Sequence, residues 1–293
     1  MLELDQEQTT VNAVRALPPN GKSVLIIQPT RGWSAPNFRE LWEFRDLLYF
    51  SVWRNLKGRY RQMALGPLWS VIQPLVNMLV YTVVFGYLAQ LPSNGVPYPV
   101  FAYVALLPWG FFSDAVNAGS GSLVGSQALI TKVYFPRLIL PFAQTLSSLY
   151  DFGLSFIILI VMLLLYRIQP TWAVVLLPLF LAIAAMTGLG VGLWFAGPIV
   201  HYRDIGNVLG YIVRVWLYAT PIVYAATIVP PQWLPLYQLN PMYAVIEGFR
   251  WALVGTPPPP TWSIVTAFVI SMFLFVTGMF TFRRSERSIV DIV

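Results

Sequence analysis

Few residues of this chain have the types and spacing that chemistry on a bound substrate requires. Gly21-Lys22-Ser23 is similar to the end of a phosphate-binding loop, but the position where the full motif needs an earlier glycine is Ala16. No apolar strand precedes the segment either, so the backbone cradle for phosphates is missing. We expect a surface turn here, and a chain that does not hydrolyse nucleotide by itself.

The acidic residues and the single histidine are no better placed for hydrolysis. Asp151 with the later Gly188-Leu189-Gly190 is faintly similar to an intramembrane aspartyl protease, but the second carboxylate of such a pair would fall at Val191. His201 has no serine motif to act on, and the absence of cysteine excludes disulfides and thiolate chemistry. The sequence therefore predicts a protein that moves a substrate rather than transforming one.

The amino-acid composition indicates the kind of protein to which these residues belong. Apolar residues make up 57% of the 293 residues, charged residues only 10%, and the mean hydropathy is +0.65. Because soluble proteins average about 25% charged residues, too few charges are present to cover a surface in water. We expect an all-α polytopic membrane protein.

Six segments are long and apolar enough to cross a bilayer, for which a helix needs about 20 residues. They are residues 68–89, 100–117, 138–165, 172–198, 205–226 and 262–282. In the resulting topology, 15 of the 18 basic residues fall on one side. The positive-inside rule then places both termini in the cytoplasm, and the first 20 residues lack the apolar core of a signal peptide.

Two further segments fit neither a span nor a simple loop. Residues 38–57 are typical of an amphipathic helix lying at the membrane surface, with a helix packed in a soluble N-terminal domain as the alternative. Residues 228–254 contain an apolar stretch too short to span, which predicts a re-entrant outer hairpin before the last span. We expect an N-terminal cytoplasmic extension (1–37), the interface helix with a basic linker (38–67) and a six-span domain (68–293).

Charged and aromatic residues inside the predicted spans are candidate functional groups. Asp151 and Arg214 each cost roughly 2.5–3.5 kcal/mol at mid-membrane, so we expect that they pair with each other or that each faces a hydrated interior. A purely structural ion pair is the alternative. Deep aromatic rings suit stacking against sugars, although lipid contact or core packing explains any one of them. The candidate channel aromatics are Tyr81, Phe85, Trp109, Phe112, Trp194 and Trp216.

Several strings in order along the chain match one family. They are RNLKGRYRQ at 54–62 with LGPLW at 65–69, the stretch 118–141, YRDI at 202–205, TPIVY at 220–224, and NPM at 240–242 with Glu247, Phe249-Arg250 and Gly255. Together they resemble the permease subunits of type-2 ABC exporters, in the branch that exports polysaccharides such as O-antigen, capsule or teichoic acid. The first 35 or so residues have no such match.

The resemblance implies a homodimeric channel-forming subunit in the bacterial inner membrane, joined to two copies of a separate ATP-binding subunit and exporting a lipid-linked polysaccharide. No cofactor would bind this chain, since ATP and Mg²⁺ would act on the partner ATPase. Alternatives are a drug or lipid exporter of the same architecture, a membrane-embedded glycan-modifying enzyme and a structural scaffold.

The resemblance also suggests roles for particular residues. Coupling to the ATPase would use Leu129, Ile130, Thr131, Lys132, Val133 and Tyr134. The outer gate would include Trp233, Asn240, Glu247 and Arg250. The basic residues Arg54, Lys57, Arg59 and Arg61 could bind the phosphates of the substrate lipid, or could serve only the positive-inside rule.

Overall fold

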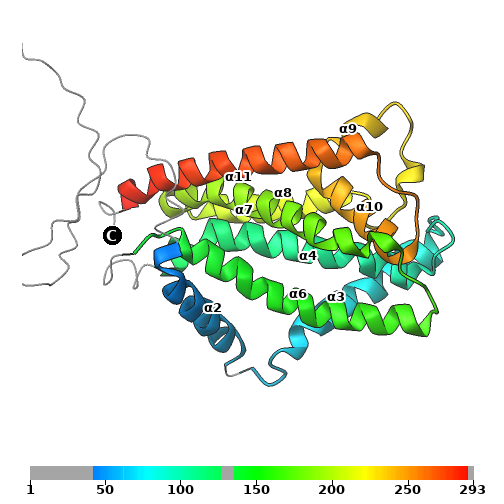
Figure 1. Ribbon diagram of the computed structural model, residues 1–293, viewed down its shortest axis with the longest axis horizontal. Helices are drawn as coiled ribbons and strands as arrows, with labels where there is room; N and C mark the ends of the chain where they lie inside the picture. The colour runs from blue at the N-terminus through cyan, green and yellow to red at the C-terminus, as the bar shows by residue number, and fades with distance from the viewer. Residues whose placement is uncertain (1–41, 62, 127–134, 290–293) are drawn as a thin grey trace, which may run out of the picture. The chain divides into compact units, whose positions relative to one another are not determined.

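The computed structural model describes residues 42–61, 63–126 and 135–289. Every regular element in these ranges is a helix, as the sequence predicts (Figure 1). The elements are α2 (Arg45–Tyr60), α3 (Leu68–Tyr81), the π-helix η1 (Thr82–Leu88), α4 (Tyr98–Gly121), η2 (Val124–Ser126), α6 (Ile139–Leu165), η3 (Trp172–Leu176), α7 (Leu177–His201), α8 (Asp204–Tyr218), η4 (Ala226–Ile228), α9 (Leu234–Gln238), α10 (Pro241–Val254) and α11 (Thr261–Ile289).

Five of the six predicted spans are present as helices long and apolar enough to cross a membrane. They are Leu68–Leu88, Tyr98–Gly121, Ile139–Leu165, Trp172–His201 and Thr261–Ser285. The predicted span 205–226 is instead α8, whose 15 residues extend only about 22 Å. The helix ends before Thr220-Pro221, where proline disfavours helical backbone in the preceding residue. A sixth crossing therefore stays a prediction.

The centre of the bundle is formed by α4 and α7, which pack against each other, while α11 covers another side of α7. Glycines allow the close approach. A Cβ at Gly192 of α7 would lie 2.4 Å from the Val116 carbonyl oxygen of α4, and one at Gly190 would lie 2.6 Å from the Leu274 backbone of α11. Small residues let membrane helices approach in this way, which gives Gly188-Leu189-Gly190 a packing role.

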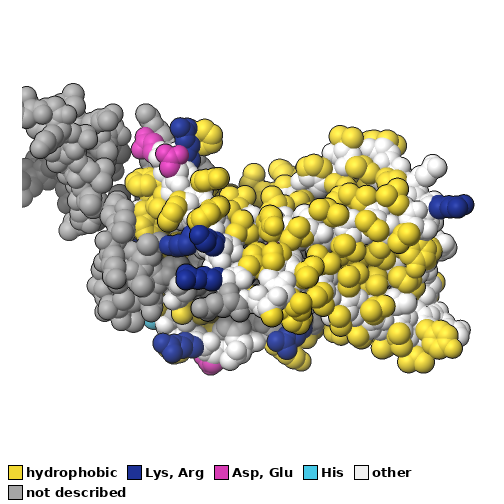
Figure 2. All heavy atoms as spheres, turned by 90° about the horizontal axis from the view of Figure 1, so that it is seen from below, with side chains coloured by type: hydrophobic (Ala, Val, Ile, Leu, Met, Phe, Trp, Pro, Cys, Tyr) yellow, Lys and Arg dark blue, Asp and Glu magenta, His cyan; other side chains and the backbone are white. Residues whose placement is uncertain are grey.

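The surface of the described unit separates apolar from basic side chains. Hydrophobic side chains cover most of the face in Figure 2, and Lys and Arg gather toward the end that carries α2. The apolar surface includes α3 and η1. Only 6% of the most apolar 18 residues of this span are buried, whereas 78% of the corresponding residues of α4 are buried. Such a surface is too apolar for water and suits lipid or another protein.

The predicted interface helix corresponds to α2, which packs against α6. Phe44, Leu47 and Leu48 pack on a cluster at the start of α6, whereas Trp42, Tyr49 and Trp53 are exposed. Aromatic side chains on the free side suit a membrane interface. The predicted extension 1–37 lies outside the described residues.

The predicted outer hairpin contains two helices, α9 and α10, at the other end of the bundle from α2 (Figure 1). Helix α10 begins with Asn240 as its N-cap, whose side chain accepts a hydrogen bond from Met242 N, and with Pro241 in the first turn. It ends at Gly255, whose φ of 74° is the left-handed conformation that glycine adopts without strain. The NPM and Gly255 motifs are thus helix start and stop signals.

Candidate functional site

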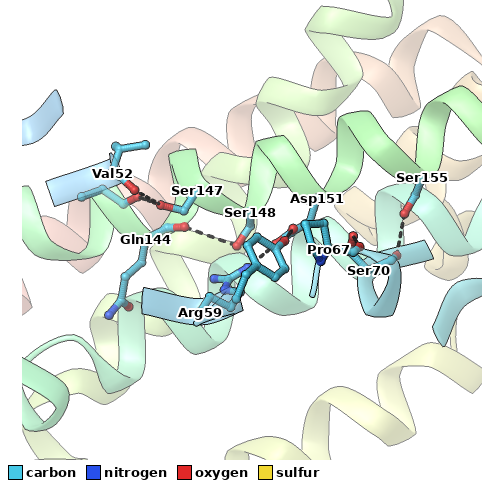
Figure 3. Close-up of polar contacts among 11 residues, drawn as sticks. Val52, Arg59, Pro67, Ser70, Gln144, Ser147, Ser148, Asp151 and Ser155 are labelled. Atoms are coloured by element: carbon cyan, nitrogen blue, oxygen red, sulfur yellow. Dashed lines mark hydrogen bonds and ion pairs between the residues drawn. The ribbon is translucent and has the colours of Figure 1, made fainter. Parts of the chain in front are cut away.

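One face of α6 carries a polar stripe through an otherwise apolar helix. Gln144, Ser148, Asp151 and Ser155 recur at intervals of three or four residues, which places them on the same side. The stripe residue Ser155 and the neighbouring Ser147 contact the entry segment of the chain (Figure 3): Ser155 Oγ donates to Ser70 O at 2.7 Å, and Ser147 Oγ lies 3.4 Å from Val52 O. These bonds hold α2 and α3 along α6.

Asp151 lies in the middle of this stripe and binds α2. Its carboxylate accepts hydrogen bonds from the Arg59 guanidinium and from the Tyr60 hydroxyl, and the Arg59–Asp151 ion pair is half-buried. Arg214 is exposed on α8. The prediction that Asp151 pairs with Arg214 is therefore wrong, because packing of α2 on α6 brings Arg59 to the carboxylate instead.

A cavity of about 690 Å³ opens beside this ion pair, between α2, α4 and α6. Its walls carry hydrogen-bonding side chains from all three helices. They are Arg54, Asn55 and Arg59 of α2, Asp114 and Asn117 of α4, and Gln144 and Ser148 of α6. Gly58 and Ala118 add small residues that leave the space open. Converging polar groups at the end of an apolar bundle are typical of a binding site.

The structure separates the four predicted phosphate-binding residues into two pairs. Arg54 and Arg59 line the cavity. Lys57 is exposed, with its ammonium 4.7 Å from the centroid of the Trp53 ring, and Arg61 is exposed just after α2. A phosphate-binding role stays a prediction for all four, but only Arg54 and Arg59 share a site.

A second polar cluster joins α10 to the segment that follows α8. Arg250 is fully buried and donates to Glu247 Oε1 at 2.8 Å, to Pro221 O at 2.6 Å and to Ile222 O at 2.7 Å. Its guanidinium carbon also lies 3.6 Å from the centroid of the Phe101 ring of α4. The cation thus joins three parts of the chain.

Asn240 extends this outer cluster. Its amide nitrogen donates to Thr220 Oγ1 at 2.8 Å, and its amide oxygen accepts from Trp216 Nε1 at 3.1 Å. Nearby, the Tyr224 hydroxyl donates to Tyr218 O at 3.0 Å, at the end of α8. Three of the predicted gate residues therefore hold the end of α8, and their part in gating stays a prediction.

The fourth predicted gate residue, Trp233, is exposed before α9. Its position outside the cluster leaves it without the contacts that fix Asn240, Glu247 and Arg250. A gating role for Trp233 likewise stays a prediction.

The predicted channel aromatics fall into two groups. Trp109 and Phe112 are buried, with ring centroids 4.9 Å apart, and Trp216 packs edge-on against Phe112 at 5.1 Å. Trp109 and Phe112 are therefore core-packing residues, and the prediction that they line a channel is wrong for this conformation. Tyr81 and Phe85 form a half-buried edge-to-face pair, and Trp194 is exposed. For these three and Trp216, a lining role stays a prediction.

Sequence reasoning missed most of the cavity wall. The spacing of Gln144, Ser148, Asp151 and Ser155 was the available signal on α6, whereas nothing in the sequence places Asn55 beside Asn117. Asp114 and Asn117 could be identified as polar residues near one end of a span, but not as members of a site. The predicted coupling segment 129–134 lies outside the described residues.

The chain is similar over most of its length to known membrane-transport proteins. Residues 46–254 match the family described as ABC-2 type transporter. The O-antigen export system permease protein RfbA of Myxococcus xanthus is 31% identical over 252 residues, which cover 85% of this chain and 96% of that protein. The polysialic acid transport protein KpsM of Escherichia coli is 22% identical over 243 residues, 81% of this chain and 92% of KpsM. The inner membrane transport permease YadH of E. coli K12 is 24% identical over 256 residues, 81% of this chain and 96% of YadH.

Proposed function

The chain belongs to the ABC-2 type transporter family, and from that membership we propose that it is the membrane permease of an exporter that moves lipid-linked polysaccharide across the bacterial inner membrane. The observation that carries the proposal is the match to the M. xanthus O-antigen permease, which extends over 96% of that relative. The match to a polysialic acid transport protein supports the same class of cargo.

Two copies of the chain would form the pathway. Arg214 is exposed on α8, and a charge facing lipid at membrane depth costs several kcal/mol, so we propose that water or a second copy covers this face. Asn207, Tyr211 and Tyr218 lie on the same face as Arg214 and are also exposed. A hydrated path between two such faces would suit a long polar chain.

The energy would come from a separate ATP-binding subunit, present in two copies, which would hold ATP and Mg²⁺. Segment 129–134 would dock on that subunit, and closure of the two ATPases would move the permease halves apart. Both termini would lie in the cytoplasm, in agreement with the distribution of basic residues. No covalent step on this chain is needed, because it supplies only the path.

Deletion of the gene from its host, followed by analysis of glycans on each side of the membrane, tests the proposal. We expect surface polysaccharide to disappear and lipid-linked polysaccharide to accumulate inside the cell, with both effects reversed by a plasmid copy. Unchanged surface polysaccharide together with lost efflux of a drug or lipid would contradict the proposal and favour the other exporter class.

A further inference from the structure

Helix α8 is polar along one face from its first turn to its last. This α8 face consists of residues at intervals of three or four, which places their side chains on one side of the helix: Asp204, Asn207, Tyr211, Arg214 and Tyr218. All five are exposed, whereas Leu209 and Val213, the buried residues of the helix, lie on the other side. A side of a helix that met lipid would be apolar, so the α8 face requires water or a polar ligand.

Arg214 on this face has no anionic partner among the described residues. Its side chain makes no ion pair and no hydrogen bond with any of them. Asp204, the carboxylate of the same face, lies ten residues earlier and therefore about 15 Å away along the helix axis. The charge of Arg214 is thus uncompensated within its own helix.

The other carboxylates inside the described bundle do not serve Arg214 either. Asp151 and Glu247 each bind an arginine of their own, and Asp114 lines the cavity between α2, α4 and α6. A second copy of the chain would bring the same residues in the same contacts. Pairing of two copies therefore adds a second Arg214 to the pathway, and the substance that passes along the α8 face must balance both charges.

Two tyrosines flank Arg214 on the α8 face. Tyr211 is 67% exposed and Tyr218 is 55% exposed, and they lie about one turn before and one turn after the arginine. A phenol ring offers an apolar surface to a sugar ring and a hydroxyl to its polar groups. A guanidinium between two such rings can form paired hydrogen bonds to a carboxylate or a phosphate. The α8 face therefore offers contacts both for sugar rings and for acidic groups attached to them.

We propose, on the basis of the exporter function inferred above, that the polysaccharide carried by this chain is acidic, and that Arg214 of each copy pairs with carboxylate or phosphate groups on its sugars. Tyr211 and Tyr218 contact the sugar rings, and Asn207 donates hydrogen bonds to them. Because these ion pairs form in a hydrated path, each is weak, which allows a long chain to move on. A neutral glycan would leave the two arginines to repel each other.

Equilibrium binding to the full-length protein in nanodiscs of zwitterionic lipid tests the site. The acidic probe is a fluorescent oligogalacturonate of uniform length, and the neutral probe is the same oligomer with its carboxylates reduced to alcohols. Arg214→Gln should weaken binding of the acidic probe about fivefold, the upper range for an exposed ion pair, and change binding of the neutral probe by less than about twofold. Arg214→Lys, which keeps the charge, should bind the acidic probe within about twofold of the unaltered protein.

The control variant is Arg167→Gln, at an exposed arginine outside α8, which should bind both probes within about twofold of the unaltered protein. The neutral probe detects misfolding, since a damaged fold would weaken binding of both oligomers. Equal affinity of the unaltered protein for the two probes would overturn the inference. Equal loss of acidic-probe binding in the Arg214→Gln and Arg167→Gln variants would overturn it in favour of a diffuse basic surface. Unchanged binding in the Arg214→Gln variant would overturn it as well and indicate that Arg214 contacts lipid phosphate.

Chemical analysis of the host's polysaccharide separates this inference from the proposed function. We expect the surface polysaccharide that disappears when the gene is deleted to contain uronic acids, sialic acids or phosphate. A neutral polysaccharide whose export requires the gene would reject the acidic cargo and leave the export function standing. Binding of the acidic probe that depends on Arg214, with surface polysaccharide that does not need the gene, would uphold a site for acidic sugars and reject the export function.

Discussion

Arg250 shows how a residue can be identified from sequence while its role is not. Arg250 and Glu247 lie three residues apart in a short apolar segment, and the family resemblance implied that they belong to an outer gate. In the structure the guanidinium is fully enclosed by Glu247, two backbone carbonyls and the Phe101 ring. The two carbonyls follow α8 and have left its helical ladder, so Arg250 satisfies acceptors that would otherwise be buried without partners.

Replacing Arg250 with Met should therefore destabilise the protein. We expect a loss of about 3–5 kcal/mol in the free energy of unfolding, because the Glu247 charge is left buried without its partner. Denaturation in detergent, followed by circular dichroism, measures this loss. Arg167→Gln, at an exposed position between α6 and η3, is the control and should change stability by less than about 0.5 kcal/mol. Equal stability of the two variants would show that the buried contacts of Arg250 do not stabilise the fold.

Asp151 provides a second prediction for single residues. In a double-mutant cycle, Asp151→Asn should couple with Arg59→Gln by about 0.5–1 kcal/mol, because the ion pair is half-buried. The cycle of Asp151→Asn with Arg214→Gln should show coupling near zero. Thermal stability of the four proteins in each cycle gives the coupling energies. Strong coupling to Arg214 instead would mean that α2 does not hold Asp151 in the membrane.

Helices marked by a long apolar run or by capping residues could be predicted from the sequence. Helix ends that depend on tertiary packing could not. The long apolar runs gave five helices close to their expected bounds, and Asn240-Pro241 and Gly255 mark the ends of α10. The predicted span 205–226 extended too far, because apolar residues after Pro221 continue the hydropathy signal beyond the end of the helix. Hydropathy indicates that a segment is apolar enough to leave water, whereas the length of a helix depends on where its backbone can stay helical.

The close packing of α7 on α4 leads to a prediction for the glycines. Gly192→Ala would place a Cβ 2.4 Å from Val116 O, so the backbones must separate, and we expect destabilisation of about 1–3 kcal/mol. Gly153→Ala on α6 is the control, because no atom lies within 4 Å of its added Cβ. That variant should be neutral or slightly more stable, since alanine favours helix. The apparent melting temperatures of both variants in detergent would test this, and an unchanged value for Gly192→Ala would exclude the tight interface.

For the molecule as a whole, the apolar exterior and the polar ends could be predicted, but the cavity could not. Composition and the positions of basic residues were sufficient for a membrane protein with a basic end. The cavity depends on three helices whose polar residues are far apart in sequence, and only the α6 stripe had a recognisable period. Contacts between segments such as α2 and α6 follow from packing that one sequence does not reveal.

Because the chain contains no cysteine, single-cysteine labelling can determine its topology without a prior substitution. Cysteines at the exposed positions Asn94 and Trp233 should react with an impermeant maleimide in intact cells. Cysteines at Arg203 and Arg284 should react only after the membrane is opened. This pattern requires α8 and the residues after it to cross the membrane. Labelling of position 233 from the same side as position 203 would contradict six crossings.

Transport by the purified proteins in lipid vesicles tests whether this chain forms a transmembrane channel whose transport is driven by ATP hydrolysis on a separate subunit. The chain, a partner ATPase from the same host and ATP are combined with lipid-linked polysaccharide added outside vesicles in which the ATPase faces outward. We expect the polysaccharide to become protected from an added glycosidase only when both proteins and ATP are present. ATP hydrolysis by this chain alone, or protection that needs neither the ATPase nor ATP, would contradict the proposed mechanism.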